Sequence, residues 1–254
     1  MNLQYVKLSV EKGVATVTLD RLDKGNSMSP DMLAEIGDVF LDLSTRDDVS
    51  VVVLTGGEKI FSAGFDLDFV KEIKKDNNDA FVALFWRTYR SIRFCAQPVI
   101  AAVGGAAMAG GFDLTQMCDI RYASERAKFG QREVVLSIIP VLDPLWRIIG
   151  FGNALDWALS GRDIDVQEAY RVGFVHRVFP EGTVVKEVTE IAQRMAAYDR
   201  ATLVETKRMS IDALHTSLDA SMRAHGWLFK NFLGSEENHR RIDSLLETIR
   251  NRKK

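Results

Sequence analysis

The sequence reads GGAAMAGGFD at residues 104–113 and FSAGFDL at residues 61–67. Each stretch follows a short apolar run, at 99–103 and 49–54, that is typical of a strand buried on both faces of a parallel sheet. Ligands of parallel α/β sheets bind at such strand ends. Glycines let a backbone expose its N–H groups, and a helix that begins near Gly110 directs its positive end at an anion. We therefore expect the two stretches to form an oxyanion hole together; the alternative is that their small residues only allow close packing.

Patterns on either side of these stretches predict an α/β body. Apolar and polar residues alternate after a turn at residues 12–13, which predicts a hairpin over residues 3–19. Serine, proline and aspartate at 29–31 begin an amphipathic helix. Apolar residues at three- and four-residue steps over 81–92 come before the apolar run at 99–103, which is the pattern of a β-α-β crossover.

The second half of the chain becomes helical. Residues 175–178 predict one more strand, and Asp165 with Glu168 forms a capping pair at the start of a short helix. Further helices are predicted at 184–198, 202–214, 217–232 and 236–249. The chain is therefore expected to consist of an α/β core at residues 1–198 and a C-terminal helical region at 199–254.

Composition narrows the function. The 254 residues include 33 Lys and Arg against 35 Asp and Glu, so the formal net charge of -2 predicts neither a nucleic-acid nor a membrane partner. Residues 1–10 lack the apolar core of a signal peptide, and the longest apolar run, at 98–112, is too short and too rich in glycine to span a membrane. The two cysteines form no CxxC motif and the four histidines are scattered, so we expect a reducing, cytoplasmic location and no metal site.

A longer set of motifs resembles the crotonase family, also called the enoyl-CoA hydratase/isomerase superfamily. The motifs are FSAGFDL at 61–67, GGFDL at 110–114 with MCD at 117–119, KFGQRE at 128–133, IP at 139–140, LSGR at 159–162, AYRVG at 169–173 and VFP at 178–180. The resemblance covers residues 3–180 and implies an α/β spiral of ββα units followed by a helical trimerisation region. It further implies a homotrimer or homohexamer that binds acyl-coenzyme A thioesters. No metal or other cofactor is implied, because coenzyme A is carried by the substrate.

The resemblance also implies roles for individual residues. Members of the family pass through a thioester enolate whose oxygen is held by two backbone N–H groups, which by position are those of Phe65 and Gly110. Asp113 and Glu133 occupy the positions of the two catalytic carboxylates, which orient a water and move protons. A close pair of carboxylates splits its titration, so that one acts as an acid and the other as a base. Taken without the resemblance, Asp113 is equally a first-turn acid that complements the helix dipole, and Glu133 a surface-loop charge.

Two residues depart from the usual hydratase pattern. Phe65 replaces a smaller residue and is expected to narrow the pocket. Asp113 replaces glutamate, and a displacement of about 1 Å at a reacting group costs on the order of a hundredfold in rate. An Asp/Glu pair is similar to that of the dienoyl-CoA isomerases, but the further acid of those enzymes falls on Val141 here, and the nearest candidate is Asp143.

The loop at residues 140–146, PVLDPLW, is bulky where straight-chain hydratases are rich in glycine. We expect it to reshape the acyl pocket for a branched, cyclic or dienoyl group. The predicted lining residues are Leu142, Asp143, Leu145 and Trp146. Trp146 is alternatively a core residue.

Coenzyme A contacts are implied along the backbone that follows the first motif. The residues concerned are Ala63, Phe65, Asp66, Leu67 and Asp68. Lys24 is a candidate for a phosphate contact or, alternatively, a loop charge. The basic run at 250–254 is expected to be a solvated tail.

Together these features predict an acyl-CoA hydratase that adds water reversibly to an α,β-unsaturated CoA thioester. The alternatives are an enoyl- or dienoyl-CoA double-bond isomerase, which uses nearly the same machinery, and an acyl-CoA-binding trimer without turnover. The hydratase is preferred because Glu133 is present and the dienoyl pattern is incomplete.

Overall fold

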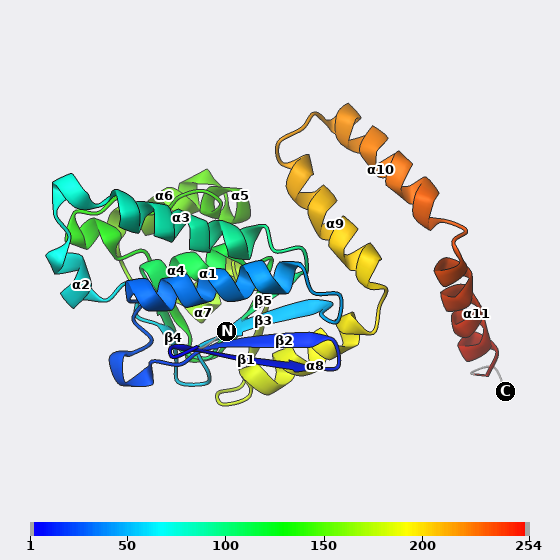
Figure 1. Cartoon of the computed structure of the whole chain (residues 1–254), viewed down its shortest axis with the longest axis horizontal. Coiled ribbons are helices and arrows are strands. Elements are labelled where there is room, and N and C mark those ends of the chain that lie inside the picture. Colours follow the sequence, from blue (N-terminus) through cyan, green and yellow to red (C-terminus); the bar gives the residue numbers. More distant parts are fainter. Residues whose placement is uncertain (1–2, 252–254) are drawn as a thin grey trace. The chain divides into compact units, whose positions relative to one another are not determined.

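The computed structural model describes residues 3–251, which excludes the last three residues of the predicted basic tail. The chain forms two compact units, Met1–Ala197 and Tyr198–Lys254, and each is described by itself (Figure 1). No helix within residues 3–251 is long and apolar enough to cross a bilayer.

A six-stranded sheet forms the centre of the first unit. Its strands, in spatial order, are β1 (Val6–Glu11), β2 (Val14–Leu19), β3 (Val51–Thr55), β5 (Val99–Val103), β7 (Ile120–Ser124) and β10 (Arg177–Phe179). The predicted hairpin is confirmed: β1 and β2 are antiparallel, and Lys12 and Gly13 both have positive φ angles in the turn. The other neighbouring strands are parallel. Every residue of β3 and β5 is buried, as the apolar runs predict.

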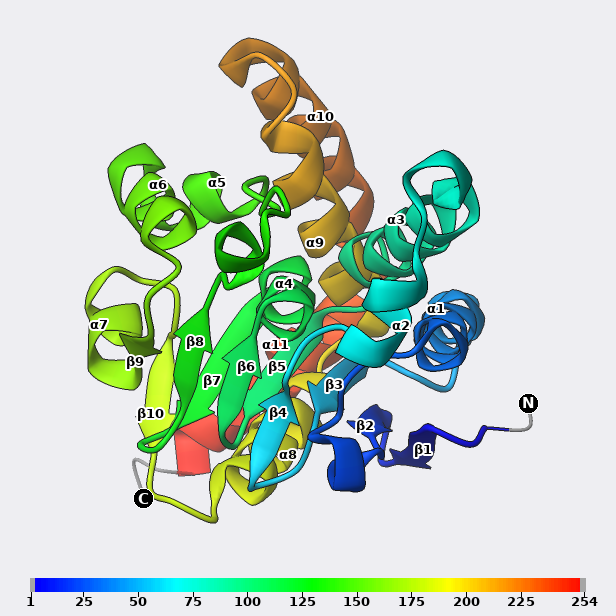
Figure 2. The same cartoon turned by 90° about the vertical axis from the view of Figure 1, so that its left-hand side faces the viewer.

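A smaller sheet contains β4 (Ile60–Ser62), β6 (Ala106–Met108), β8 (Lys128–Gly130) and β9 (Ile164–Asp165), in that order (Figure 2). The strands β4, β6 and β8 are parallel. Successive strands of the chain alternate between the sheets, with β3, β5 and β7 in the large one and β4, β6 and β8 in the small one. The sequence does not predict these short strands. The stretch at 104–113 directly follows β5, as predicted, and contains β6, whereas the stretch at 61–67 begins within β4 and does not directly follow β3.

Helices cover the large sheet. α1 (Pro30–Ser44) begins where the sequence predicts it: Ser29 accepts a hydrogen bond from the N–H of Met32 at 3.3 Å. α1 packs against α3 (Asp79–Arg93), and α8 (Val184–Ala196) packs against β2, β3, β5 and β7. The remaining helices of this unit are η1 (Leu22–Lys24), α2 (Leu67–Glu72), η2 (Lys75–Asn77), η3 (Glu133–Leu136), α5 (Leu145–Ile149), α6 (Phe151–Ser160) and α7 (Val166–Arg171).

The helix α4 (Gly110–Met117) follows β6 directly and is buried on every side. Phe112 anchors it in the core, because its ring stacks on Phe174 with centroids 4.9 Å apart and meets Trp157 and Phe129 edge-on. Successive residues of an α-helix differ by about 100° in direction. The next side chain, that of Asp113, therefore leaves the helix in a direction that the aromatic core fixes.

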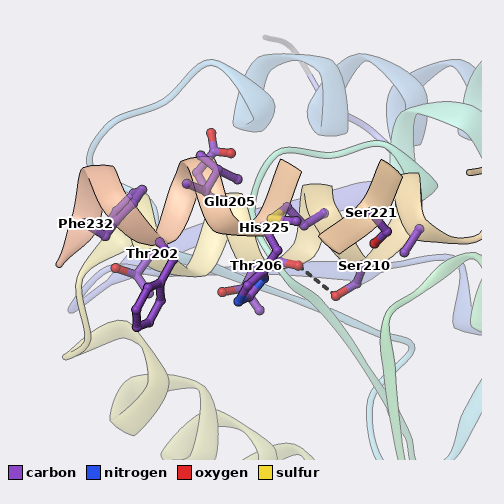
Figure 3. Close-up of a pocket in the computed structure, with 11 residues that line it drawn as sticks. Thr202, Glu205, Thr206, Ser210, Ser221, His225 and Phe232 are labelled. Carbon is purple, nitrogen blue, oxygen red and sulfur yellow. Dashed lines mark hydrogen bonds between the residues drawn. The ribbon is translucent and has the colours of Figure 1, made fainter. Parts of the chain in front are cut away.

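The second unit consists of three helices, α9 (Arg200–Ala213), α10 (Leu218–Phe232) and α11 (Glu236–Asn251). Asp199 and Ser217 cap the first two of them. No residue of α10 is buried, and α9 and α10 enclose a cavity of about 340 Å³ that Thr202, Thr206, Ser221 and His225 help to line (Figure 3). Within this unit the apolar faces of the helices are therefore only partly covered.

Candidate active site

Three parallel strand ends bring the predicted site residues together. Phe65 follows β4, Gly110 follows β6, and Glu133 follows β8. The register pairs Met108 with Gly130 at the ends of β6 and β8. The N–H of Ala109, the first residue after β6, donates to the Gly130 carbonyl at 2.7 Å. The three loops therefore leave the same edge of the small sheet, with the N-terminus of α4 on the middle strand (Figure 2).

The backbone at Phe65 has its N–H turned toward this edge. Met28 bridges the two residues on either side of it: the Met28 N–H donates to the Gly64 carbonyl at 2.7 Å, and the Met28 carbonyl accepts from the Asp66 N–H at 3.0 Å. In a parallel bridge of this kind the N–H of the middle residue points away from the partner strand. A Cβ placed on Gly64 would lie 3.3 Å from the Gly110 nitrogen, so the two loops that carry the predicted oxyanion donors are in contact.

The Phe65 ring lies against the start of α4. A Cβ built on Gly110 would lie 3.1 Å from two carbons of this ring, so a side chain at position 110 would require the ring to shift by a few tenths of an ångström. The ring packs edge-on against Phe81 and Phe85, with centroids 5.4 and 5.7 Å away, and Phe85 continues the cluster to Tyr89 at 4.2 Å. An aromatic wall therefore runs from the predicted oxyanion donor to the buried end of α3.

Asp113 lies at the end of this wall and is 1% exposed. Its Oδ1 accepts a hydrogen bond from Gln116 Nε2 at 2.6 Å, and its Oδ2 lies 3.5 Å from the Tyr89 hydroxyl, which donates to the Gly110 carbonyl at 2.9 Å. Burial, followed by the nearby Glu133 carboxylate, raises the pKa of Asp113 well above its usual value. Burial therefore favours the protonated form of Asp113, which distinguishes it from a first-turn helix charge in water.

Glu133 is 5% exposed and has no hydrogen-bond partner for either carboxylate oxygen within the described part of the chain. Burial raises the pKa of Glu133 to about 7. Its position rules out the alternative of a solvated loop charge. A buried carboxylate whose two oxygens both lack a hydrogen-bond donor is expected where a bound substrate or water supplies that donor.

Two glutamines complete the polar side of the site, and the sequence motifs do not assign either of them a role. Gln116 and Gln131 donate their side-chain N–H groups to the same acceptor, the Val141 carbonyl, at 3.2 and 2.6 Å. The Oε1 atoms of both are buried and have no donor among residues 3–251. Gln116 is three residues beyond Asp113 on α4, a spacing that places two helical side chains on one face and that could have predicted the contact.

The family comparison agrees with this geometry. The enoyl-CoA hydratase/isomerase family matches residues 9–252. A short-chain-enoyl-CoA hydratase of Clostridium acetobutylicum is 31% identical over 97% of this chain and 96% of its own length. A crotonyl-CoA hydratase of Syntrophomonas wolfei is 30% identical over the same shares of the two chains. A crystal structure of an enoyl-CoA hydratase from Bacillus anthracis superposes with a TM-score of 0.92 at 28% identity, covering 96% of this chain and 97% of the other.

The chain belongs to the enoyl-CoA hydratase/isomerase family. It is therefore an enzyme of the hydratase/isomerase type with a crotonase-like α/β fold, as the motifs imply.

The loop at 140–146 carries the side chains that are predicted to line the acyl pocket. Leu145 is fully buried in the core, and Leu142 is half-buried against it. Asp143 is tied to Arg147 by contacts of 2.9 to 3.1 Å, and its side chain is 55% exposed. Trp146 is 38% exposed, with the Arg147 guanidinium 4.3 Å from its ring centre. Leu142 and Trp146 are therefore the two apolar side chains of the predicted lining that are still partly exposed. Asp143 forms an ion pair with Arg147.

Several groups in the predicted coenzyme A segment form hydrogen bonds or ion pairs within the protein. Asp66 caps α2, accepting from the Asp68 N–H at 3.1 Å, and pairs with Arg21 at 2.7 Å; this guanidinium lowers the pKa of Asp66. The Ala63 N–H donates to the Gly25 carbonyl at 2.9 Å. The side chains of Leu67 and Asp68 are exposed. Lys24 is the last residue of η1. No sequence motif reveals Arg21, which fixes the loop that carries Lys24 to the loop after β4.

A cavity of about 460 Å³ lies between α2 and α3. Its lining includes Phe69, Ile73, Phe81 and Leu84. Because Phe81 also packs on Phe65, this apolar space adjoins the aromatic wall of the site. The sequence did not predict it.

Backbone strain occurs at the start of α4. Ala109 has φ 47° and ψ −127°, a region that only glycine adopts without a cost of about 1–3 kcal/mol. We expect Ala109→Gly to raise the free energy of unfolding by about 1 kcal/mol, because relief of strain exceeds the added entropy of the unfolded chain. Denaturant unfolding measures the change. The matched control is Ala106→Gly in β6, which should lower stability by about 0.5–1 kcal/mol; equal losses in both variants would contradict the strain.

Proposed function

We propose that this enzyme adds water reversibly to the double bond of an α,β-unsaturated acyl-CoA thioester through an enolate intermediate. The observation that carries the proposal is the pair of buried carboxyl groups, Asp113 in α4 and Glu133 at the start of η3, next to the segments that carry the backbone N–H groups of Phe65 and Gly110. The hydratases among its relatives, named for short-chain-enoyl-CoA and crotonyl-CoA, support the same reaction.

The order of the two pKa values supports a division of roles. Asp113 is fully buried and faces the charge of Glu133, so it keeps its proton, while Glu133 ionises near pH 7. The raised pKa of Asp113 favours its protonated form, so once Glu133 has ionised we assign the remaining proton of the pair to Asp113. Glu133 is the base that takes a proton from water, and Asp113 is the acid that delivers a proton to carbon.

The steps of hydration follow from these roles. Water loses a proton to Glu133 as its oxygen bonds to the β-carbon, and the π electrons of the double bond move toward the thioester carbonyl. The enolate oxygen accepts hydrogen bonds from the N–H groups of Phe65 and Gly110; one such donor typically contributes about 2.7–4 kcal/mol to transition-state stabilisation. The enolate then takes a proton from Asp113 at the α-carbon. Dehydration is the reverse.

The experiment that tests the function is mass spectrometry of straight, branched and cyclic unsaturated acyl-CoAs incubated with the protein in D2O. Addition of one water supports the hydratase and identifies the acyl class. Deuterium uptake at an unchanged formula supports the isomerase instead. The observation that favours this second candidate is the raised pKa of both Asp113 and Glu133, because a pair with one acid and one base can also move a proton between two carbons. No change in any thioester would contradict both.

The acyl group that we propose is branched, cyclic or dienoyl, because Leu142 and Trp146 offer bulky apolar surface. Replacing Trp146 with alanine is expected to change the ratio of kcat/KM for a branched and a straight-chain substrate by about tenfold, since about one to three kcal/mol separates ligands that fill or leave an apolar pocket. The kcat for a four-carbon substrate should stay within about twofold of the unmodified enzyme. Equal effects on all acyl groups would remove Trp146 from the pocket.

We further propose that copies of this chain associate through the second unit into a trimer or a pair of trimers. Leu218, Met222 and Phe229 lie on one face of α10, and each is 58% or more exposed in the single chain. A soluble monomer rarely leaves such a contiguous apolar face uncovered. Light scattering on the purified protein measures the mass; a monomer at micromolar concentration would contradict this assembly.

A further inference from the structure

We propose that Gln116 is a positioning residue that makes Oδ2 of Asp113 the proton-bearing oxygen and connects Asp113 to the loop at 140–146. This inference rests on the proposed function for its kinetic consequences but not for its geometry. It goes beyond the two carboxylates because no family motif assigns a role to residue 116.

The orientation of the Gln116 amide is fixed by its neighbours. The Val141 carbonyl can only accept a hydrogen bond, and both Gln116 and Gln131 approach it, at 3.2 and 2.6 Å. If either amide were turned over, its oxygen would face the carbonyl oxygen and repel it. Both glutamines must therefore present N–H groups to Val141, and both Oε1 atoms must point elsewhere in the buried site.

This orientation decides where Asp113 carries its proton. Gln116 Nε2 lies 2.6 Å from Oδ1, so an N–H hydrogen occupies the space in which a proton on Oδ1 would have to sit. Oδ2 has a weaker competitor, because the Tyr89 hydroxyl lies 3.5 Å away and donates over a shorter distance, 2.9 Å, to the Gly110 carbonyl. The proton of Asp113 therefore belongs on Oδ2, on the side of the carboxyl group that faces Tyr89.

The groups around Asp113 come from three further elements. Tyr89 faces it from α3, Glu133 from η3, and Gln131 from the segment after β8. Among these, Glu133 and burial raise the pKa of Asp113, whereas the hydrogen bonds from the two glutamines and Tyr89 lower it. Gln116 and Gln131 both connect Asp113 to the loop at 140–146, and Gln116 does so with a 2.6 Å hydrogen bond to Oδ1. A movement of Val141 would therefore reach Asp113 through these two amides.

The test compares Gln116→Met, which keeps the length of the side chain but removes its N–H groups, with the unmodified enzyme. Infrared spectroscopy of protein labelled with 13C at the aspartate carboxyl group follows the Asp113 carboxyl band, assigned by its loss in Asp113→Asn. We expect the midpoint of Asp113 titration to rise by about one pH unit in Gln116→Met, since a hydrogen bond to the charged form is lost. In the same variant kcat should fall about tenfold with KM within about twofold.

Gln97 supplies the matched control. It is also a buried glutamine whose Nε2 holds two backbone carbonyls, those of Leu43 and Arg46, at 2.7 and 3.1 Å. Gln97→Met should lower stability without moving the Asp113 band or the ratio of kcat to KM. Gln116→Glu tests the orientation, because its carboxylate repels Val141 and Asp113 until it is protonated; the ratio of its activity to that of the unmodified enzyme should rise as the pH falls from about 8 to about 6.

An unchanged Asp113 midpoint in Gln116→Met overturns the proposal, as does a loss of kcat no larger than that of Gln97→Met. The infrared measurement needs no turnover. An unmodified protein that acts on no thioester would therefore contradict the proposed function alone, while the band shift would still decide the role of Gln116.

Discussion

Glu133→Gln is expected to lower kcat for hydration by about 10²–10⁴-fold, the range typical for loss of a general base. Glutamine keeps the shape of the side chain but takes no proton from water. Affinity for an acyl-CoA should change less than about threefold, because no group within residues 3–251 donates a hydrogen bond to the Glu133 carboxylate. Steady-state kinetics and calorimetric titration with a saturated acyl-CoA measure the two quantities.

Stability gives an independent check on the same variant. The pKa of Glu133 is raised by burial to about 7 from 4.5, so the folded protein binds the proton more tightly than the unfolded chain. The unmodified enzyme therefore loses stability as the pH rises from about 4.5 through 7, and Glu133→Gln does not. The variant should be more stable by about 1–3 kcal/mol near pH 8 and similar near pH 4. A less stable variant near pH 8 would mean that the carboxylate has a favourable partner.

The elements that the sequence predicts best are the long periodic ones. The N-cap of α1 and the buried strands β3 and β5 follow directly from local patterns. The strands β4, β6 and β8 cannot be predicted in this way, because three residues are too few to show a period of two.

Strand boundaries fail for a different reason. The apolar run predicts a strand over 175–178, but β10 is Arg177–Phe179. The N–H of Val175 still donates to the Ala169 carbonyl at 3.0 Å, so this residue belongs to the turn that ends α7. The competing hydrogen bond comes from a neighbouring element, which periodicity does not reveal.

The site residues also differ in whether local sequence patterns can predict them. Asp113 and Glu133 can be chosen from motifs, since each follows a recognisable glycine-containing loop. Tyr89 cannot, because it comes from α3, and only the packing of α3 on α4 brings its hydroxyl to Asp113. The ion pair between Asp143 and Arg147 could have been predicted from the sequence, because the two residues are four apart, the spacing at which oppositely charged side chains meet on a helix.

Asp113→Asn is expected to lower kcat for hydration by about 10²–10⁴-fold, because the amide delivers no proton to the α-carbon. Asparagine has nearly the same shape, and its Oδ1 can still accept from Gln116 at the position now 2.6 Å away. Asp113→Glu is the matched variant that keeps an acid. Its extra methylene has no room in a position that is 1% exposed, so we expect a loss of about a hundredfold.

The pH dependence separates the two carboxyl groups. In the unmodified enzyme, hydration should rise through pH 7 as Glu133 ionises and fall at higher pH as Asp113 loses the proton that burial and Glu133 make it hold. Asp113→Asn removes the group that gives the fall, so its residual activity should rise through the same region and then stay level. Profiles of kcat measured for both proteins decide this. A fall at high pH that persists in Asp113→Asn would assign the acid to another residue, and a rise that disappears with it would mean that Asp113, not Glu133, takes the proton from water.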